Sequence, residues 1–325
     1  MNILVAGVTS FLGRACADVL MKRGHTVYAM MRPNSPNRYR VDSYDKYKIV
    51  ECDLADTHRL QYMNLPHMHA CIDFAWAGVG VSGRMDSSIQ EANLRMSLSL
   101  LTNAGLLGCR RFLFAGSQAE YGVTLEKLMA DKCKYEPITE DYECNPVSEY
   151  GKAKLQMLHD ATTLANLQMP NMEYIHMRYF SVYGAGDHAT SLTDTCIRGF
   201  MQDMHVNLGP CQQMWNYLYI DDAARATADL LECEFCFESD INSHVVNIAA
   251  DHSRRLCEYV EAIYEALGRR GSFMFHERQP SVEGTPYLLP DNARLRGLIG
   301  GFSQTRFEEG VREIEKMYSM RQQNK

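Results

Sequence analysis

The chain begins with MNILVAGVTSFLGRACADVL (residues 1–20), and this stretch decides the fold class. The apolar run Ile3 to Ala6 predicts a buried strand. Gly7 and Gly13 frame a turn that leads directly into a helix. One apolar stripe at helical spacing follows, formed by Leu12, Cys16, Val19 and Leu20. A strand, a glycine-containing turn and a helix in this order are typical of a dinucleotide-binding α/β unit.

The same alternation of short apolar runs and helical stretches continues along the chain. Strands are expected at 3–6, 26–31, 48–51, 71–75, 112–115, 174–179 and 244–248. This order predicts a doubly wound, Rossmann-like parallel sheet with helices on both faces and right-handed crossovers. We expect residues 1–182 plus about 215–250 to form this domain. Residues 183–214 plus 251–325 are expected to form a smaller, mostly C-terminal substrate-binding lobe.

Composition excludes several classes of protein. The 325 residues include 33 Lys plus Arg against 40 Asp plus Glu, a formal charge of −7, which disfavours nucleic-acid binding. The sequence has no run of about 18 apolar residues, so no membrane span is expected. The N-terminal residues lack the basic segment typical of a secretory signal, so no signal is expected either. Eleven scattered cysteines indicate reduced thiols and a cytoplasmic protein. The single C-x-x-C, Cys233 to Cys236, lacks a second ligand pair, so we expect no metal site.

Three further features concern the cofactor. Glycines in the 7–13 turn let the backbone approach a pyrophosphate at the helix N-terminus, and Ser10 stands where a middle glycine is usual. The second strand ends at Met31 and Arg32 with no acid nearby, and an arginine at this corner accommodates a 2′-phosphate. The sequence therefore predicts NADP, with NAD possible. Asp53, after the third strand, is placed to accept from the adenine amino group.

The catalytic pattern consists of a tyrosine and a lysine in YGKAK (residues 150–154). Four residues apart on a helix, Tyr150 and Lys154 share one face. We expect the ammonium to lower the tyrosine pKa, so that Tyr150 exchanges a hydroxyl proton while a nicotinamide moves a hydride. Ser117, at the end of the preceding strand, is expected to bond the same substrate oxygen.

Together these motifs resemble the extended short-chain dehydrogenase/reductases, and among them the NAD(P)-dependent epimerase/dehydratase family that acts on nucleotide sugars. The segments that carry the resemblance are GVTSFLG (7–13), CDL (52–54), FAWAG (74–78), Asn93, GSQAEYG (116–122), YGKAK (150–154), RYFSVYGAG (178–186) and YLYIDDAARA (217–226). The resemblance covers nearly the whole chain. It implies that Ser117, Tyr150 and Lys154 are catalytic.

The resemblance also implies binding residues and an assembly. Implied cofactor contacts are Gly7, Thr9, Ser10, Phe11, Leu12, Gly13, Arg32, Asp53, Leu54, Phe74, Ala75, Trp76, Asn93, Tyr150, Lys154, Tyr179, Ser181 and Val182. Implied contacts to a nucleotide sugar are Trp76, Ser117, Gln118, Ser181 and Trp215. Helices around 88–107 and 146–166 resemble those that pair two protomers, which predicts a homodimer. The apolar residues of these helices, such as Met96, Leu100, Leu155 and Leu158, are not all expected to face the sheet.

Departures from the family pattern narrow the chemistry. The 4,6-dehydratases carry an acidic pair just after the catalytic serine, whereas Gln118 and Ala119 stand here. Glu120 is one place further and is expected to point away, because side chains alternate along extended backbone. Asp73 replaces a usual histidine. Trp215 replaces a usual arginine, which means either stacking on a sugar ring or a repacked site.

Three functions fit this sequence. The main prediction is an NADPH-dependent reductase of the 4-keto group of a nucleoside-diphosphate deoxysugar. The alternative is a nucleotide-sugar 4-epimerase, which needs the same three residues but retains its dinucleotide through turnover. A remote alternative is a dinucleotide-sensing binding protein without catalysis.

Overall fold

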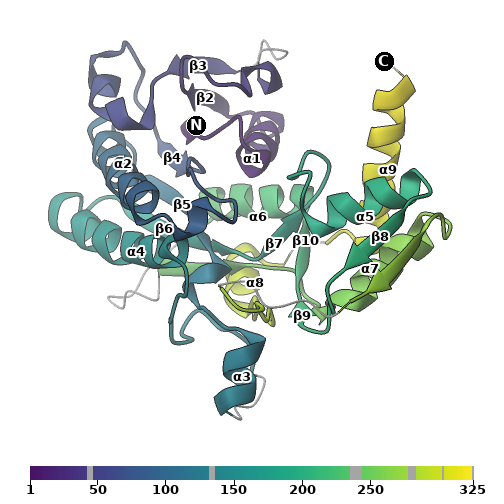
Figure 1. Ribbon diagram of the computed structural model, residues 1–325. Helices are drawn as coiled ribbons and strands as arrows, with labels where there is room; N and C mark the ends of the chain where they lie inside the picture. Colours follow the sequence, from purple (N-terminus) through teal and green to yellow (C-terminus); the bar gives the residue numbers. More distant parts are fainter. Residues whose placement is uncertain (42–46, 132–135, 235–243, 277–282, 302–303, 324–325) are drawn as a thin grey trace.

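A parallel sheet of seven strands forms the centre of the protein, seen here in a computed structural model that describes residues 1–41, 47–131, 136–234, 244–276, 283–301 and 304–323 (Figure 1). The strands are β1 (Asn2–Ala6), β2 (Thr26–Met31), β3 (Lys48–Glu51), β4 (Ala70–Asp73), β5 (Arg111–Ser117), β6 (Glu173–Tyr179) and β11 (Val245–Ile248). Their spatial order is β11-β6-β5-β4-β1-β2-β3. All seven predicted strands are present, and the doubly wound fold is confirmed.

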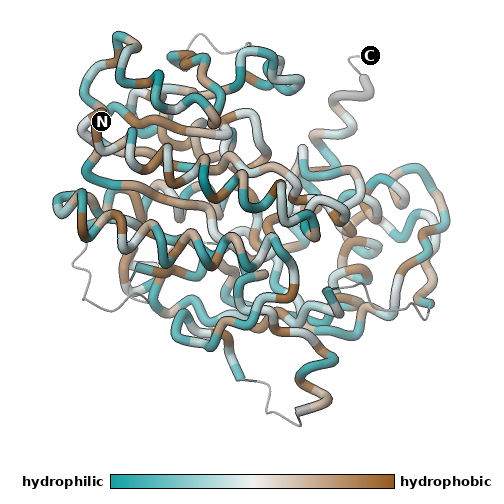
Figure 2. Tube along the Cα trace, turned by 60° about the vertical axis from the view of Figure 1, so that its left-hand side comes forward, coloured by the Kyte–Doolittle hydropathy of each residue, from teal (hydrophilic) through white to brown (hydrophobic). Residues whose placement is uncertain are grey.

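Helices cover both faces of this sheet. One face carries α1 (Phe11–Lys22), α6 (Ile220–Glu232) and α8 (Ala293–Ile299); the other carries α2 (Ser87–Leu106), α4 (Glu149–Gln168) and the 3₁₀ segment η2 (Leu54–Tyr62). Alternate residues of β1 enter the two cores, Ile3 and Val5 on one side and Leu4 on the other. Hydrophobic residues therefore gather along the strands between the two helical layers (Figure 2). Burial on both sides explains why these strands are apolar without alternation.

A smaller lobe packs beside the sheet, at the right of Figure 1. It contains α5 (Leu192–Met201), α7 (Leu256–Ala266), α9 (Phe307–Gln323), β8 (His205–Leu208) and β13 (Ser272–Phe275), around a core of its own. Short pairs connect the lobes: β7 (Ser181–Tyr183) with β10 (Tyr217–Tyr219), and β9 (Met214–Trp215) with β12 (Arg254–Arg255). The helix α3 (Leu125–Asp131) projects from the lower edge of Figure 1. The division into two lobes stays a prediction; Leu295 of α8 lies in the core of the larger one.

The long helices α2 and α4 bear on the dimer prediction. Leu100 and Leu158 are buried in the sheet-facing core, whereas Met96 and Leu155 are only partly buried. Helical periodicity alone did not distinguish the face toward the sheet from the face toward solvent. Leu106 and Leu167 are instead 65% and 77% exposed. The homodimer itself stays a prediction.

No helix in the described part of the chain is both long enough and apolar enough to cross a membrane.

Candidate functional site

A cavity of about 300 Å³ opens at the carboxyl ends of β1 to β4. In the sheet, β2 lies on one side of β1 and β4 on the other, so the order of the strands reverses at β1. Doubly wound sheets bind ligands at the carboxyl ends of the strands where this reversal occurs. Its walls include many of the predicted cofactor residues: Gly7, Thr9, Ser10, Arg32, Asp53, Leu54, Phe74, Ala75, Trp76 and Asn93. Lining residues that the sequence did not single out include Ser35, Asn37 and Ala77, and Met96, named above for the dimer, also lines this cavity.

The glycine loop requires its glycines for close packing. Gly7 has a φ of +75°, and a Cβ there would lie 2.7 Å from the backbone nitrogen of Ala75. A Cβ on Gly13 would lie 2.4 Å from the carbonyl oxygen of Gly7. Ser10 is the N-cap of α1, where its Oγ accepts the Gly13 N–H at 3.1 Å. Ser10 thus replaces the expected glycine as a helix cap, and Phe11, Leu12 and Gly13 form the first turn of α1 behind it.

The corner beyond β2 is rich in arginine. Arg32 is exposed there, and Met31 pairs in register with Glu51 of β3. Glu51 lies beside this corner on the neighbouring strand, where it forms an ion pair with Arg38 and is not among the residues that line the cavity. Arg40, which sequence reasoning missed, donates to the carbonyl oxygen of Thr9 at 3.2 Å.

The second half of the site brings the predicted catalytic residues together. Ser117 ends β5 and caps the 3₁₀ turn η4 (Gln118–Glu120), while Tyr150 and Lys154 lie one turn apart on α4. The Ser117 hydroxyl hydrogen-bonds Tyr150 and acts to lower its pKa. Lys154 Nζ donates to the carbonyl oxygen of Ala115 at 2.6 Å and lies 3.7 Å from the centre of the Trp76 ring.

The ionisation of this group differs from the sequence-based expectation. Burial raises the pKa of Tyr150, and the groups that oppose this rise are Ser117 and Arg84. Lys154 was predicted to lower that pKa, but burial lowers its own pKa to about 7, against the opposing charge of Asp73. The pKa of Tyr150 therefore lies above its usual value and not below it, because burial disfavours the charged form of each side chain.

Asp73 lies beside Lys154, the predicted catalytic lysine. Its side chain is buried at the end of β4, and its Oδ1 accepts the backbone N–H of Ala75 at 2.9 Å. Burial raises the pKa of Asp73, and the ammonium of Lys154 acts to lower it. The residue that replaces the family's usual histidine is therefore an electrostatic partner of Lys154.

Glu120 points into the protein, but the reason differs from the predicted one. The backbone from Gln118 is a 3₁₀ turn, not an extended strand, and it carries Glu120 into the core. The carboxylate accepts the N–H of Ser117 at 2.7 Å, Nε of Arg178 at 2.7 Å and Nε2 of His176 at 3.0 Å. These neighbours hold the pKa of Glu120 at about 2, despite its complete burial. Glu120 is thus a fixed anion that positions Ser117.

The loop after β4 is held by two amides. Asn93 bonds the backbone of Ala77 with both ends of its side chain, at 3.1 and 2.9 Å. Gln90, which the sequence did not single out, accepts the indole N–H of Trp76 at 2.7 Å. Gln90 is a polar residue that is buried on α2. This burial of a polar side chain is the feature that marks it as part of the site.

The remaining predicted contacts lie further along the chain. The Tyr179 hydroxyl is 2.5 Å from Thr227 Oγ1, so the Tyr179 side chain packs under α6 and not in the cavity. Ser181 and Val182 belong to β7, which pairs with β10. The buried indole nitrogen of Trp215 has no hydrogen-bond partner among the described residues. Both interpretations of Trp215 remain compatible with this position.

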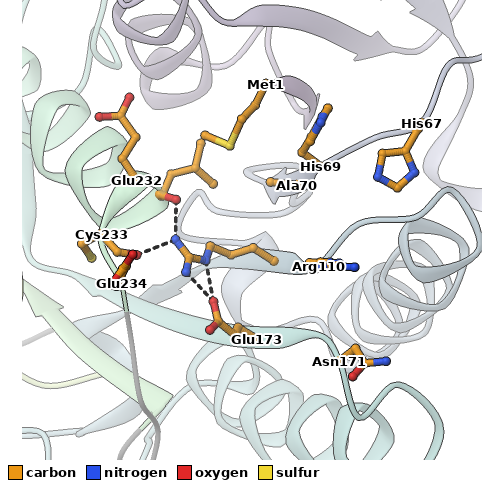
Figure 3. A pocket seen from close by; sticks show the side chains of 12 residues that line it. Met1, His67, His69, Ala70, Arg110, Asn171, Glu173, Glu232, Cys233 and Glu234 are labelled. Atoms are coloured by element: carbon orange, nitrogen blue, oxygen red, sulfur yellow. Dashed lines mark hydrogen bonds and ion pairs between the residues drawn. The ribbon is translucent and has the colours of Figure 1, made fainter.

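A second cavity, of about 760 Å³, lies at the opposite edge of the sheet, where β1, β4, β5 and β6 begin (Figure 3). Arg111 fills its floor and donates to the carbonyl oxygens of Leu231 and Cys233 and to Glu173. His67 and His69 stand at its rim and are exposed. These contacts tie the end of α6 to the sheet, and the cavity is remote from Ser117.

Cys236 of the C-x-x-C pair lies outside the described residues. Within them, no three His, Cys, Asp or Glu side chains gather closely enough to hold a metal ion.

Comparison with known proteins places this geometry in a family. The sequence profile of the NAD dependent epimerase/dehydratase family matches residues 3–249. A UDP-glucose 4-epimerase from Lactobacillus helveticus is 27% identical, over 92% of this chain and 91% of the relative. A UDP-N-acetyl-alpha-D-glucosaminuronate decarboxylase from Bacillus cytotoxicus is 22% identical, over 95% of each chain.

A solved structure has the same fold over nearly its full length. It is the UDP-glucuronic acid 4-epimerase from Bacillus cereus in complex with UDP-glucuronic acid and NAD, with a TM-score of 0.78 and 20% identity, covering 98% of this chain and 100% of that one. The profile match spans most of the chain and includes the glycine loop, Ser117, Tyr150 and Lys154. The protein is therefore a member of the NAD-dependent epimerase/dehydratase family.

Proposed function

We propose that the protein is a UDP-sugar 4-epimerase that retains a nicotinamide dinucleotide through turnover. This replaces the 4-ketoreductase that the sequence favoured as the main prediction. Support comes from the similarity to 4-epimerases of Lactobacillus helveticus and Bacillus cereus, which differ in the sugar they are named for.

The observation that separates this proposal from a dehydratase is the fixed state of Glu120. Elimination of water from a sugar needs an acid and a base beside the carbons that change, as well as the residues for oxidation. Glu120 is the acid of the 117–120 turn, and it is buried and bonded to Arg178, His176 and the Ser117 backbone. The site therefore supports proton exchange at one hydroxyl, through Ser117 and Tyr150.

The cavity at the carboxyl ends of β1 to β4 suits a dinucleotide. The N-terminus of α1 carries partial positive charge behind the 7–13 turn, which favours a pyrophosphate. Asp53 and Arg32 lie where an adenosine would be held, and Trp76 leads toward Tyr150. A bound nicotinamide would accept a hydride from the sugar and return it to the opposite face.

The protein's own groups handle the proton. Tyr150 takes the proton of the C4 hydroxyl and gives it back after the hydride returns, while Ser117 bonds the same oxygen. Lys154 is the proposed contact to the dinucleotide ribose, next to Trp76 and Tyr150. Gln118, Ser181 and Trp215 are the proposed contacts to the sugar nucleotide, beyond Ser117 and Trp76.

The test begins with the purified protein and no added cofactor. Mass spectrometry of the released small molecules identifies any retained dinucleotide. UDP-glucose, UDP-N-acetylglucosamine and UDP-glucuronic acid are then each incubated with the protein, and the 4-epimers are quantified by NMR. We expect a 4-epimer from at least one sugar, and none from the Tyr150→Phe variant. A stoichiometric consumption of added NADPH with a 4-keto sugar, and no epimer from any substrate, would establish the reductase instead.

A further inference from the structure

An arginine outside the predicted site lies over the catalytic tyrosine. The guanidinium carbon of Arg84 is 4.3 Å from the centre of the Tyr150 ring. Arg84 belongs to the 3₁₀ turn η3 (Gly83–Met85), between β4 and α2. A cation over the face of an aromatic ring is attracted to it, and a phenolate strengthens that attraction.

The same arginine is held by an acid from a distant part of the chain. Nε of Arg84 lies 2.8 and 3.1 Å from the two carboxylate oxygens of Glu283, and Nη2 lies 3.0 Å from one of them. The two side chains are only 20% and 22% exposed. This bidentate, largely enclosed pair differs from the flexible ion pairs of an open surface.

Both partners are fixed by their backbones. The buried amide of Gln90 donates to the carbonyl oxygens of Gly83 and Gly78, at 2.8 and 3.2 Å, and so anchors the turn that carries Arg84. On the other side, the segment after Glu283 is bonded through Thr285 to Leu125 and to Glu126. Arg84 and Glu283 therefore reach Tyr150 from two anchored elements.

We propose that Arg84 and Glu283 are positioning residues that set how readily Tyr150 gives up its proton. The two charges have opposite effects on a phenolate. Arg84 stabilises it directly, and Glu283 weakens this effect by neutralising Arg84 and by its own negative charge. The proposal rests on the proposed function, because it concerns the residue that exchanges the substrate proton.

Other groups facing Tyr150 fit this assignment. Ser117 bonds its hydroxyl, and Lys154 Nζ is 5.7 Å from its ring centre. Glu120 acts from below the 117–120 turn to raise the pKa of Tyr150, as does Glu283, while Arg84 acts to lower it. Glu120 is already committed to Arg178 and His176, whereas Arg84 lies over the face of the Tyr150 ring and is paired with Glu283 alone among these groups.

The test measures Tyr150 directly and needs no substrate. Tyrosine labelled with ¹³C at Cζ gives a resonance for Tyr150, which is assigned by its absence in Tyr150→Phe. Glu283→Gln should raise the phenolate-to-phenol ratio of Tyr150 at a given alkaline pH by about 3- to 10-fold, and Arg84→Met should lower it by a similar factor. Arg84→Lys should stay close to the parent protein.

If the Arg84–Glu283 pair only held the two segments together, the variants would affect Tyr150 differently. Loss of either partner would then loosen the same contact, so both variants would move Tyr150 in the same direction, or not at all, and either result would overturn the proposal. Arg269→Met, which removes an exposed pair with Glu265 on α7, is the matched control and should leave Tyr150 unchanged. The NMR result stands whether or not the protein epimerises a UDP-sugar, so failure of the proposed function remains distinguishable. With an active substrate, the acidic limb of the pH profile of kcat/KM should shift to lower pH in Glu283→Gln and to higher pH in Arg84→Met.

Discussion

The carboxylate of Glu120 accepts the backbone N–H of Ser117 at 2.7 Å, which closes a capping box at the end of β5. The same carboxylate meets Arg178 and His176, both fully buried. Gly116 is required beside them, because a Cβ there would lie 2.4 Å from Nε2 of His176. A charge network in the core thus fixes the start of the turn that presents Ser117.

The first prediction concerns this network and stability. The pKa of Glu120 is about 2 in the folded protein, below the 4.5 of a free glutamate. Its contribution to stability is therefore present above pH 4.5 and is lost as the pH falls toward 2. Glu120→Gln should lower the free energy of unfolding at pH 7 by about 3 kcal/mol, because it also leaves Arg178 without its counter-ion. Urea denaturation from pH 7 down to pH 3 measures this difference, which should shrink at the acidic end.

Glu265→Gln is the control for this measurement. Glu265 pairs with Arg269 on the exposed side of α7, so its removal should change stability by less than about 0.5 kcal/mol. Equal effects of the two substitutions would show that Glu120 does not stabilise the fold through its charge.

The second prediction concerns the catalytic residues. Tyr150→Phe keeps the ring but removes the exchangeable proton, so kcat should fall about 100- to 10,000-fold with little change in dinucleotide affinity. Lys154→Met should reduce both turnover and dinucleotide binding. Ser117→Ala should cost less than either, because one hydrogen bond to the reacting oxygen is lost. Steady-state kinetics on the epimerised sugar, with dinucleotide affinity measured separately, checks all three. Near-full turnover by Tyr150→Phe with rate-limiting chemistry would remove Tyr150 from the mechanism.

The third prediction concerns the choice of dinucleotide. Arg32 is exposed at the end of β2, and Glu51 on the neighbouring strand is paired with Arg38. We expect NADPH to bind more tightly than NADH by about 1.5–3 kcal/mol, through charge-assisted bonds to the 2′-phosphate. Arg32→Ala should remove most of this preference and leave NADH binding almost unchanged. Calorimetric titration of both dinucleotides into protein from which any retained dinucleotide has been removed decides it, and equal affinities in the parent protein would contradict the role of Arg32.

The fourth prediction concerns assembly. A homodimer through α2 and α4 should appear in light scattering as a particle of about twice the 37.0 kDa chain mass at micromolar concentration. Because Leu100 and Leu158 face the sheet, the substitutions that test this contact belong at the exposed Leu106 and Leu167. Leu106→Glu together with Leu167→Glu should shift the particle toward the monomer. A particle of only 37 kDa from the parent protein would rule out the dimer.

The sequence by itself determined the sheet, the glycine loop and which three residues, Ser117, Tyr150 and Lys154, are the catalytic candidates. Each of these depends on a local pattern: an apolar run buried on both faces, a turn that only glycine allows, or two side chains one helical turn apart. These patterns can be identified without knowing which distant residues pack nearby. The strand positions and the placement of Ser117, Tyr150 and Lys154 could therefore be predicted.

Only the tertiary structure decided the electrostatics of the site. Arg84 and Glu283 are 199 residues apart, and nothing in either local sequence indicates that they meet over Tyr150. The acid Glu51 lies beside the Arg32 corner on a neighbouring strand, and the turn after Ser117 carries Glu120 into the core. Burial, which sets the pKa of Tyr150 and Lys154, is a property of the packed protein. Two charges interact across space, and the energy of the interaction depends on how far the surrounding protein excludes water. The effect of each charge on the site is therefore defined only in the folded chain.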